Sequence, residues 1–116
     1  MVAFLRESIR SVWNVELLLV LARNPGRAWM PDDLVREMRA SDHVVRDGLK
    51  LLQVAGLIGA VSPSTFSYLP ASDDLRRLVE ELEWQYRERP QTVTRAIFAP
   101  RDKLRTLAEA FRLKKD

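Results

Sequence analysis

The sequence contains no cysteine and only one histidine, His43, among its 116 residues. Without cysteine the chain has neither a disulfide nor a thiolate nucleophile, which fits a reducing compartment and predicts a cytoplasmic protein. Its longest apolar run, Leu17–Ala22, is far shorter than the ~18 residues that a membrane span needs. The first ten residues carry both basic and acidic side chains, so we expect no signal peptide and no association with a membrane.

Catalytic and metal-binding motifs are also lacking. The sequence contains no HExxH, no GxSxG and no Gly-rich loop before a helix. Ser41, Asp42 and His43 are neighbours in the chain, but consecutive residues of a helix point about 100° apart and cannot form a catalytic relay. Carboxylates alone rarely hold a transition metal. We therefore expect no enzymatic activity, no metal site and no cofactor.

Charge is unevenly distributed along the chain. The formal net charge is +3, yet residues 57–72 contain no charged side chain. Residues 31–56 contain more acidic than basic side chains, so the positive excess lies in residues 1–30 and 73–116. Because phosphate neutralisation normally supplies most of the affinity for DNA, this distribution counts against simple DNA binding by the middle of the chain.

The length fits one domain, and its periodicity is mainly helical. We expect residues 1–72 and a helical extension, residues 73–116, to form one compact unit. Breakers, capping residues and apolar spacing predict helices over residues 6–23, from Pro31 to about 38, and over 41–56, 73–89, 91–99 and 101–113. Ser72 is the expected N-cap of the helix over 73–89, and a strand is the alternative for residues 91–99. A short strand is expected at residues 28–30, and two further strands at 57–61 and 65–69 form a hairpin around Ser62, Pro63 and Ser64.

The stretch SDHVVRDGLKLLQVAGLI, residues 41–58, is the most informative part of the chain. At helical spacing its apolar residues fall on one arc and its polar residues on the other. Ser41 is a good N-cap, and Gly56 stands where the chain leaves a helix with a positive φ. The predicted hairpin follows directly.

This S-x-x-x-V-x-x-x-L-x-x-L-x-x-x-G-L-I pattern resembles the recognition helix and wing of winged helix-turn-helix regulators, the MarR/PadR-like superfamily, over roughly residues 8–70. The resemblance implies a mainly α fold with a small antiparallel β-wing and a C-terminal helical extension. It also implies a transcriptional regulator that reads the major groove of double-stranded DNA with helix 41–56. We expect a homodimer with two recognition helices about one helical turn apart.

The candidate DNA-binding residues lie on the polar arc of this helix and at the hairpin tip. Arg46 can hydrogen-bond guanine, and Lys50 can reach a phosphate or a guanine. In the alternative, Asp42 and Asp47 pair with Arg46 and Lys50, and the arc is only a solvated surface. The full set is Ser41, Asp42, His43, Arg46, Lys50, Gln53 and Ser64.

The last third of the chain carries aromatic and apolar residues beyond what a winged helix needs. In the family, helices that follow the wing often build a dimer, and we expect that role here, with packing in the core or a small pocket as the alternatives. The candidate interface residues are Trp84, Tyr86, Ile97, Phe98 and Phe111. A second candidate function is a winged-helix module that binds a protein partner and not DNA.

Overall fold

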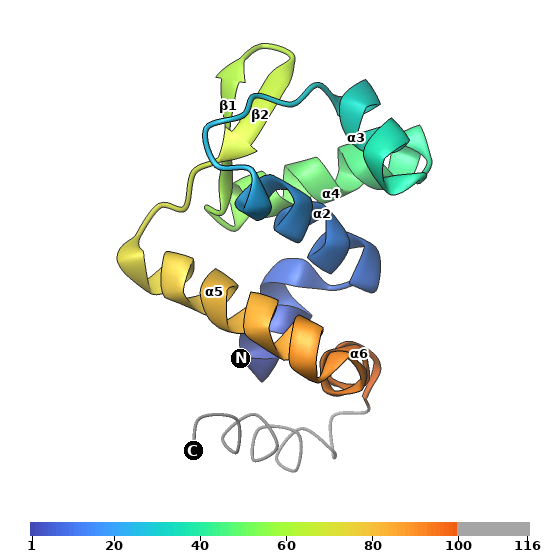
Figure 1. The fold of residues 1–116 in the computed structure, drawn as a ribbon, viewed down its shortest axis with the longest axis vertical. Helices are drawn as coiled ribbons and strands as arrows, with labels where there is room; N and C mark the ends of the chain where they lie inside the picture. Colours follow the sequence, from blue (N-terminus) through green and yellow to red (C-terminus); the bar gives the residue numbers. More distant parts are fainter. Residues whose placement is uncertain (100–116) are drawn as a thin grey trace.

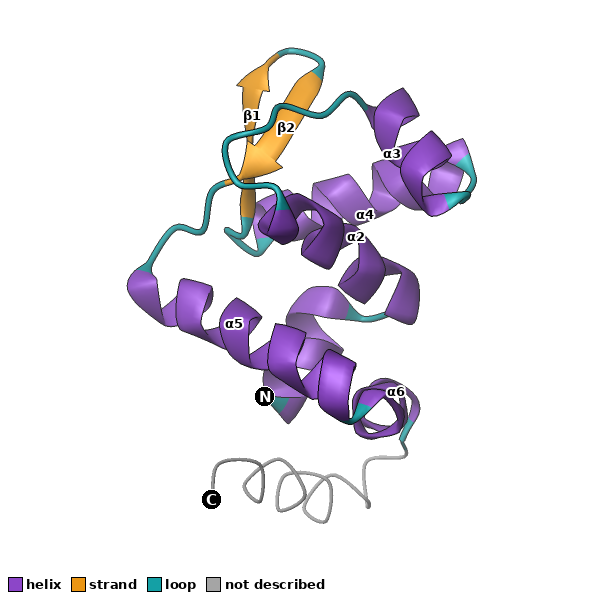
Figure 2. Cartoon of the chain, viewed as in Figure 1, coloured by secondary structure: helices purple, strands orange, loops and turns teal. Residues whose placement is uncertain are grey.

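The computed structural model describes residues 1–99, which form a mainly helical structure with one small antiparallel sheet (Figures 1 and 2). The elements are α1 (Val2–Phe4), the π-helical turn η1 (Leu5–Ile9), α2 (Val12–Arg23), α3 (Pro31–Met38), α4 (Asp42–Val54), β1 (Ile58–Ser62), β2 (Thr65–Tyr68), α5 (Asp73–Glu88) and α6 (Pro90–Phe98). The predicted helix over residues 101–113 lies outside the described residues.

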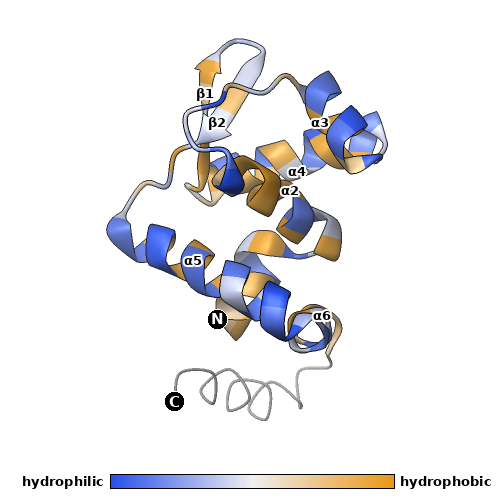
Figure 3. Ribbon diagram, viewed as in Figure 1, coloured by the Kyte–Doolittle hydropathy of each residue, from blue (hydrophilic) through white to orange (hydrophobic). Residues whose placement is uncertain are grey.

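Helix α2 forms the centre of the fold. It contacts η1, α3, α4, α5 and β2, so it is covered on several sides. Leu17, Leu18, Leu19 and Leu21 are almost completely buried, and Figure 3 shows α2 as a strongly hydrophobic segment among more polar helices. Helix α2 therefore carries apolar residues on more than one face, and packing within the chain accounts for them.

The predicted continuous helix over residues 6–23 is wrong, because the chain breaks at Arg10. Arg10 adopts a left-handed conformation with φ +73°, and its N–H donates to the carbonyl of Leu5 at 2.7 Å. Ser11 then begins α2 as its N-cap and accepts a hydrogen bond from the N–H of Asn14 at 3.1 Å. The Asn14 amide also donates to the carbonyl of Ile9 at 2.8 Å, which joins the two helical segments across the break.

The predicted helix starts from Pro31, Ser41 and Ser72 are confirmed. Pro31 occupies the first turn of α3, where its missing N–H is not needed. The hydroxyls of Ser41 and Ser72 accept hydrogen bonds from the N–H groups of Val44 and Leu75. Helix α4 ends at Val54, two residues before the predicted end, and the chain turns at residue 56 with φ +78°.

The two strands form an antiparallel hairpin in which Ile58 pairs with Tyr68 and Ala60 with Phe66. The strand expected at residues 28–30 is reduced to a single bridge between Trp29 and Phe66. The two residues exchange both backbone hydrogen bonds at 2.8 Å. The loop between α2 and α3 thus lies along the free edge of β2.

Helices α5 and α6 pack against each other, and α6 also contacts η1 (Figure 1). The Arg6 guanidinium donates to the carbonyls of Ala96, Ile97 and Ala99 at 3.2, 3.3 and 2.7 Å. These are carbonyls at the end of a helix, which have no partner within the helix itself. Arg6 therefore fixes the C-terminal end of α6 on the N-terminal segment.

Candidate nucleic-acid interface

The polar face of α4 is exposed along its full length. Val45, Gly48, Leu49 and Leu52 are buried and attach the helix to the core. Helical spacing then turns the intervening polar residues away from the core. Every side chain predicted to contact DNA is exposed: Ser41 at the N-cap of α4, Asp42, His43, Arg46, Lys50 and Gln53 on α4, and Ser64 at the hairpin tip.

Gly48 permits the close approach of α4 to α2 that sets this orientation. A Cβ at this position would lie 2.6 Å from Oδ1 of Asn14 and 2.7 Å from Cδ2 of Leu17. Real side chains do not tolerate such contacts without displacement. The glycine therefore sets how closely α4 packs against α2, and so the position of the polar face of α4.

A groove of about 520 Å³ lies against this face. Its apolar lining comes from Pro31 of α3, Leu49 of α4 and Phe66 of β2. The remaining lining consists of the α4 residues Asp42, His43, Arg46, Asp47, Lys50 and Gln53. The groove thus brings most of the predicted site residues together, whereas Ser41 and Ser64 do not line it.

Most charges on the face are paired within α4. Nε of Arg46 donates to both carboxylate oxygens of Asp42 at 2.8 and 2.9 Å. The expected pair of Asp42 with Arg46 is therefore confirmed. Nε2 of His43 lies 3.0 Å from Oδ2 of Asp47, and the expected pair of Asp47 with Lys50 is wrong. Within residues 1–99, Lys50 has no acidic partner. Lys50 can therefore bind an anionic ligand without first leaving an acidic partner.

Phe66 and two residues connected to it, Trp29 and Arg27, were not predicted from the sequence as parts of a site. Phe66 lines the groove, and its bridge to Trp29 places the loop before α3 beside the hairpin. Trp29 is 1% exposed, and the Arg27 guanidinium lies 3.5 Å from the centroid of its ring. A short strand was predicted at residues 28–30, but nothing local in the sequence indicated its pairing with β2.

The predicted interface residues of the last third have different surroundings. Ile97 is buried in the core cluster, and the Tyr86 hydroxyl donates to Oε1 of Glu16 at 2.7 Å. Trp84 is partly buried, whereas Phe98 is 72% exposed. Phe111 lies outside the described residues. Core packing within the chain thus accounts for Ile97 and partly for Tyr86, and Phe98 is the exposed member of the set.

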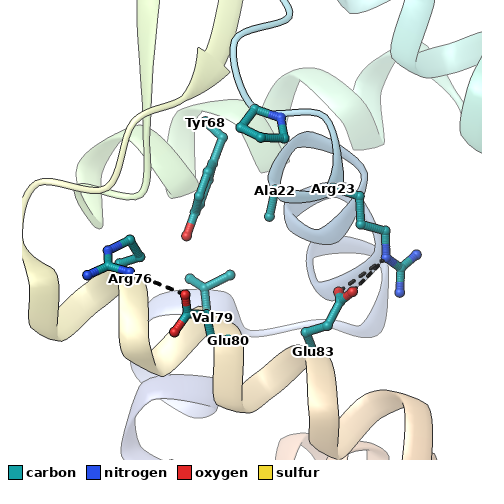
Figure 4. Close-up of a pocket in the computed structure, with 8 residues that line it drawn as sticks. Ala22, Arg23, Tyr68, Arg76, Val79, Glu80 and Glu83 are labelled. Atoms are coloured by element: carbon teal, nitrogen blue, oxygen red, sulfur yellow. Dashed lines mark hydrogen bonds and ion pairs between the residues drawn. The ribbon is translucent and has the colours of Figure 1, made fainter.

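A second hollow, of about 410 Å³, lies between the end of α2, β2 and α5 (Figure 4). The Tyr68 side chain points into it toward α5, and its pKa is raised by burial and then by the nearby Glu80 carboxylate. On the rim, Arg23 pairs with Glu83 and Arg76 with Glu80. The charged groups of the hollow therefore neutralise one another.

In the part of the chain that the structure describes, no group of three or more His, Cys, Asp or Glu side chains is placed to hold a metal ion. No helix within residues 1–99 is long and apolar enough to cross a membrane. The chain matches no protein-family model, no curated protein and no solved structure.

Proposed function

We propose that this chain is a winged helix-turn-helix DNA-binding protein, in which α4 enters the major groove and the β1–β2 hairpin is the wing. The observation that carries the proposal is the uncovered polar face of α4, which lies beside the hairpin and next to the short turn from α3. A helix in the major groove needs such a face, with several long polar side chains free to reach base edges and phosphates.

The internal ion pairs of α4 are too weak to prevent this function. The side chains of Arg46 and Asp42 are 56% and 58% exposed. An exposed pair of this spacing stabilises a helix by about 0.2–0.5 kcal/mol, whereas a good bidentate contact to a base discriminates by about 1–3 kcal/mol. Arg46 can therefore leave Asp42 for a guanine at small cost. The same carboxylate disfavours binding where no guanine is present, which favours specific over non-specific sites.

The roles we assign follow from position and charge. Lys50 contacts a phosphate or guanine, Arg46 reads guanine, and Gln53 has the donor and acceptor pair that suits adenine. Ser41 already accepts a hydrogen bond as the N-cap, and its hydroxyl hydrogen is left to donate to a phosphate. Regulation of transcription is the biological role that this proposal implies.

The experiment is a titration of the full chain with fluorescent mixed genomic fragments, from low to physiological salt. We expect the logarithm of the binding constant to fall linearly with that of the salt concentration, with a slope of about −1 for each phosphate neutralised. Lys50→Gln is expected to weaken binding about tenfold, as befits a lost charged hydrogen bond. Arg77→Gln removes the same charge from an exposed position of α5 and serves as the matched control.

Absence of binding at the lowest salt would overturn the proposal. Equal loss of affinity in Lys50→Gln and Arg77→Gln would assign binding to net charge and not to α4. If DNA does bind, selecting a preferred sequence from the bound fragments is the stricter test of whether Arg46 recognises guanine.

A protein-binding function is the second candidate, and the hairpin favours it. Residues 57–72 are uncharged, and Val61 and Leu69 are 51% and 52% exposed. Val54 at the end of α4 is 87% exposed. Exposed apolar side chains of this kind are typical of contacts with another protein. Failure of DNA binding, with the fold intact by circular dichroism, would favour this second function.

A further inference from the structure

We propose that Arg27 contacts a DNA phosphate beside the wing and supplies the positive charge that the wing itself lacks. The inference rests on the proposed DNA-binding function and adds a residue outside both α4 and the hairpin. Residues 57–72 contain no Lys or Arg, so a phosphate near the hairpin finds no cation there. Arg27 is distant from the hairpin in sequence but next to it in the structure.

Hydrogen bonds from two residues of β2, Phe66 and Ser67, place Arg27 at the edge of the hairpin. Trp29 exchanges both of its backbone hydrogen bonds with Phe66 at 2.8 Å, which adds the loop to the free edge of β2. The Ser67 hydroxyl donates to the carbonyl of Arg27 at 2.6 Å. The backbone of Arg27 is therefore fixed against β2, and Phe66 of the same strand lines the groove of α4.

The side chain is held in place by Trp29. The guanidinium lies 3.5 Å from the centroid of the indole, and the indole is 1% exposed and cannot move away. Stacking occupies one face of the planar group and leaves the N–H donors on its edge for a ligand. This fork of donors matches the oxygens of a phosphate.

Arg27 also lacks the internal neutralisation seen elsewhere on the surface. Arg23, Arg36, Arg46 and Arg76 each pair with a carboxylate. Within the described part of the chain, the guanidinium of Arg27 has no acidic partner. A cation that is ordered in advance and unpaired binds an anion without losing an existing ion pair.

The test uses Arg27→Met, which removes the charge but keeps a flexible apolar side chain over Trp29. In the same salt titration with mixed genomic fragments, we expect the log–log slope to become shallower by about 0.9 for each Arg27 that contacts a phosphate. We expect affinity at low salt to fall about tenfold. Arg27→Lys keeps the charge without the stacked plane and is expected to retain the wild-type slope with weaker binding. Arg77→Met, at an exposed position of α5, is the control for net charge.

The outcomes separate the two proposals. Wild-type binding with an unchanged slope in Arg27→Met would overturn the role of Arg27 and leave the DNA-binding function intact. No wild-type binding at low salt would overturn both. A fall in melting temperature for Arg27→Ala but not for Arg27→Met, with both slopes equal to that of the wild type, would assign Arg27 only to covering Trp29.

Discussion

Tyr86 ties α5 to α2 through a single hydrogen bond that depends on its proton. Its hydroxyl donates to Oε1 of Glu16 at 2.7 Å. Burial, followed by the hydrogen bond to Glu16 and the negative charge of Glu16, raises the pKa of Tyr86 to about 12. The folded protein therefore holds this proton at a pH where an unfolded tyrosine, with a pKa of about 10, has lost it.

From this shift we expect the free energy of unfolding to fall as pH rises from about 10 to 12. Tyr86 contributes its full share of the free energy of unfolding below the pKa of the unfolded tyrosine, about 10. This share is lost as the pH rises through the pKa of Tyr86 in the folded protein. Urea denaturation at several pH values between 8 and 12 measures it, and Tyr86→Phe should lose less stability over that range. Tyr68→Phe is the necessary companion, because the pKa of Tyr68 is raised too. An identical alkaline loss in the wild type and in Tyr86→Phe would contradict the assignment.

A site residue could be predicted from the sequence only where its position depends on local periodicity. The polar face of α4 was predictable because Arg46, Lys50 and Gln53 are set by helical periodicity alone. Arg27 was not, since its place beside the hairpin depends on a contact between Arg27 and Ser67, which are 40 residues apart in the chain. Local patterns carry no information about such a contact.

Among the elements, helix starts were predicted well and one helix interruption was missed. The N-caps Ser41 and Ser72 accept hydrogen bonds from residues only three positions ahead, so the local sequence is enough to predict them. Arg10 interrupts residues 6–23 in a left-handed conformation that its side-chain type does not favour. Apolar residues continue on both sides of it, and Ser11 was the available but overlooked signal for a new N-cap.

The crossing of α2 and α4 gives a prediction for Gly48→Ala. Alanine is favoured by about 1 kcal/mol in a helix, but its methyl group would lie 2.6 Å from Oδ1 of Asn14. Displacing Asn14 breaks its 2.8 Å hydrogen bond to the carbonyl of Ile9. Overpacking of this kind costs about 1–3 kcal/mol, which exceeds the gain in helix propensity, so we expect a net destabilisation of up to about 2 kcal/mol.

Chemical denaturation of Gly48→Ala and Gln53→Ala provides the measurement and its control. Gln53 lies on the exposed face of the same helix, and its replacement should change stability by no more than about 0.5 kcal/mol. A Gly48→Ala variant at least as stable as the wild type would show that α2 and α4 can separate without loss.

For the molecule as a whole, homodimer formation stays a prediction, and Phe98 offers its clearest test. Its side chain is 72% exposed at the end of α6, unlike the buried Ile97 beside it. We expect the wild type to sediment as a dimer and Phe98→Glu as a monomer with unchanged circular dichroism, because a buried charge opposes association. Trp13→Glu, at another exposed aromatic residue, is the control and should remain dimeric. A wild type that stays monomeric at high concentration would contradict the prediction.

The hydrogen bonds from Arg6 to the carbonyls at the end of α6 affect the order in which the chain folds. These hydrogen bonds connect residues that are separated by 90 to 93 positions in the sequence, among the most distant contacts of the described chain. Contacts of such separation close large loops and form late, after the local hairpin and the α3–α4 turn. The end of α6, where Phe98 is displayed, is thus expected to be the last part to assemble and the first to be released. Association through this end would then slow global unfolding, and dilution would speed it.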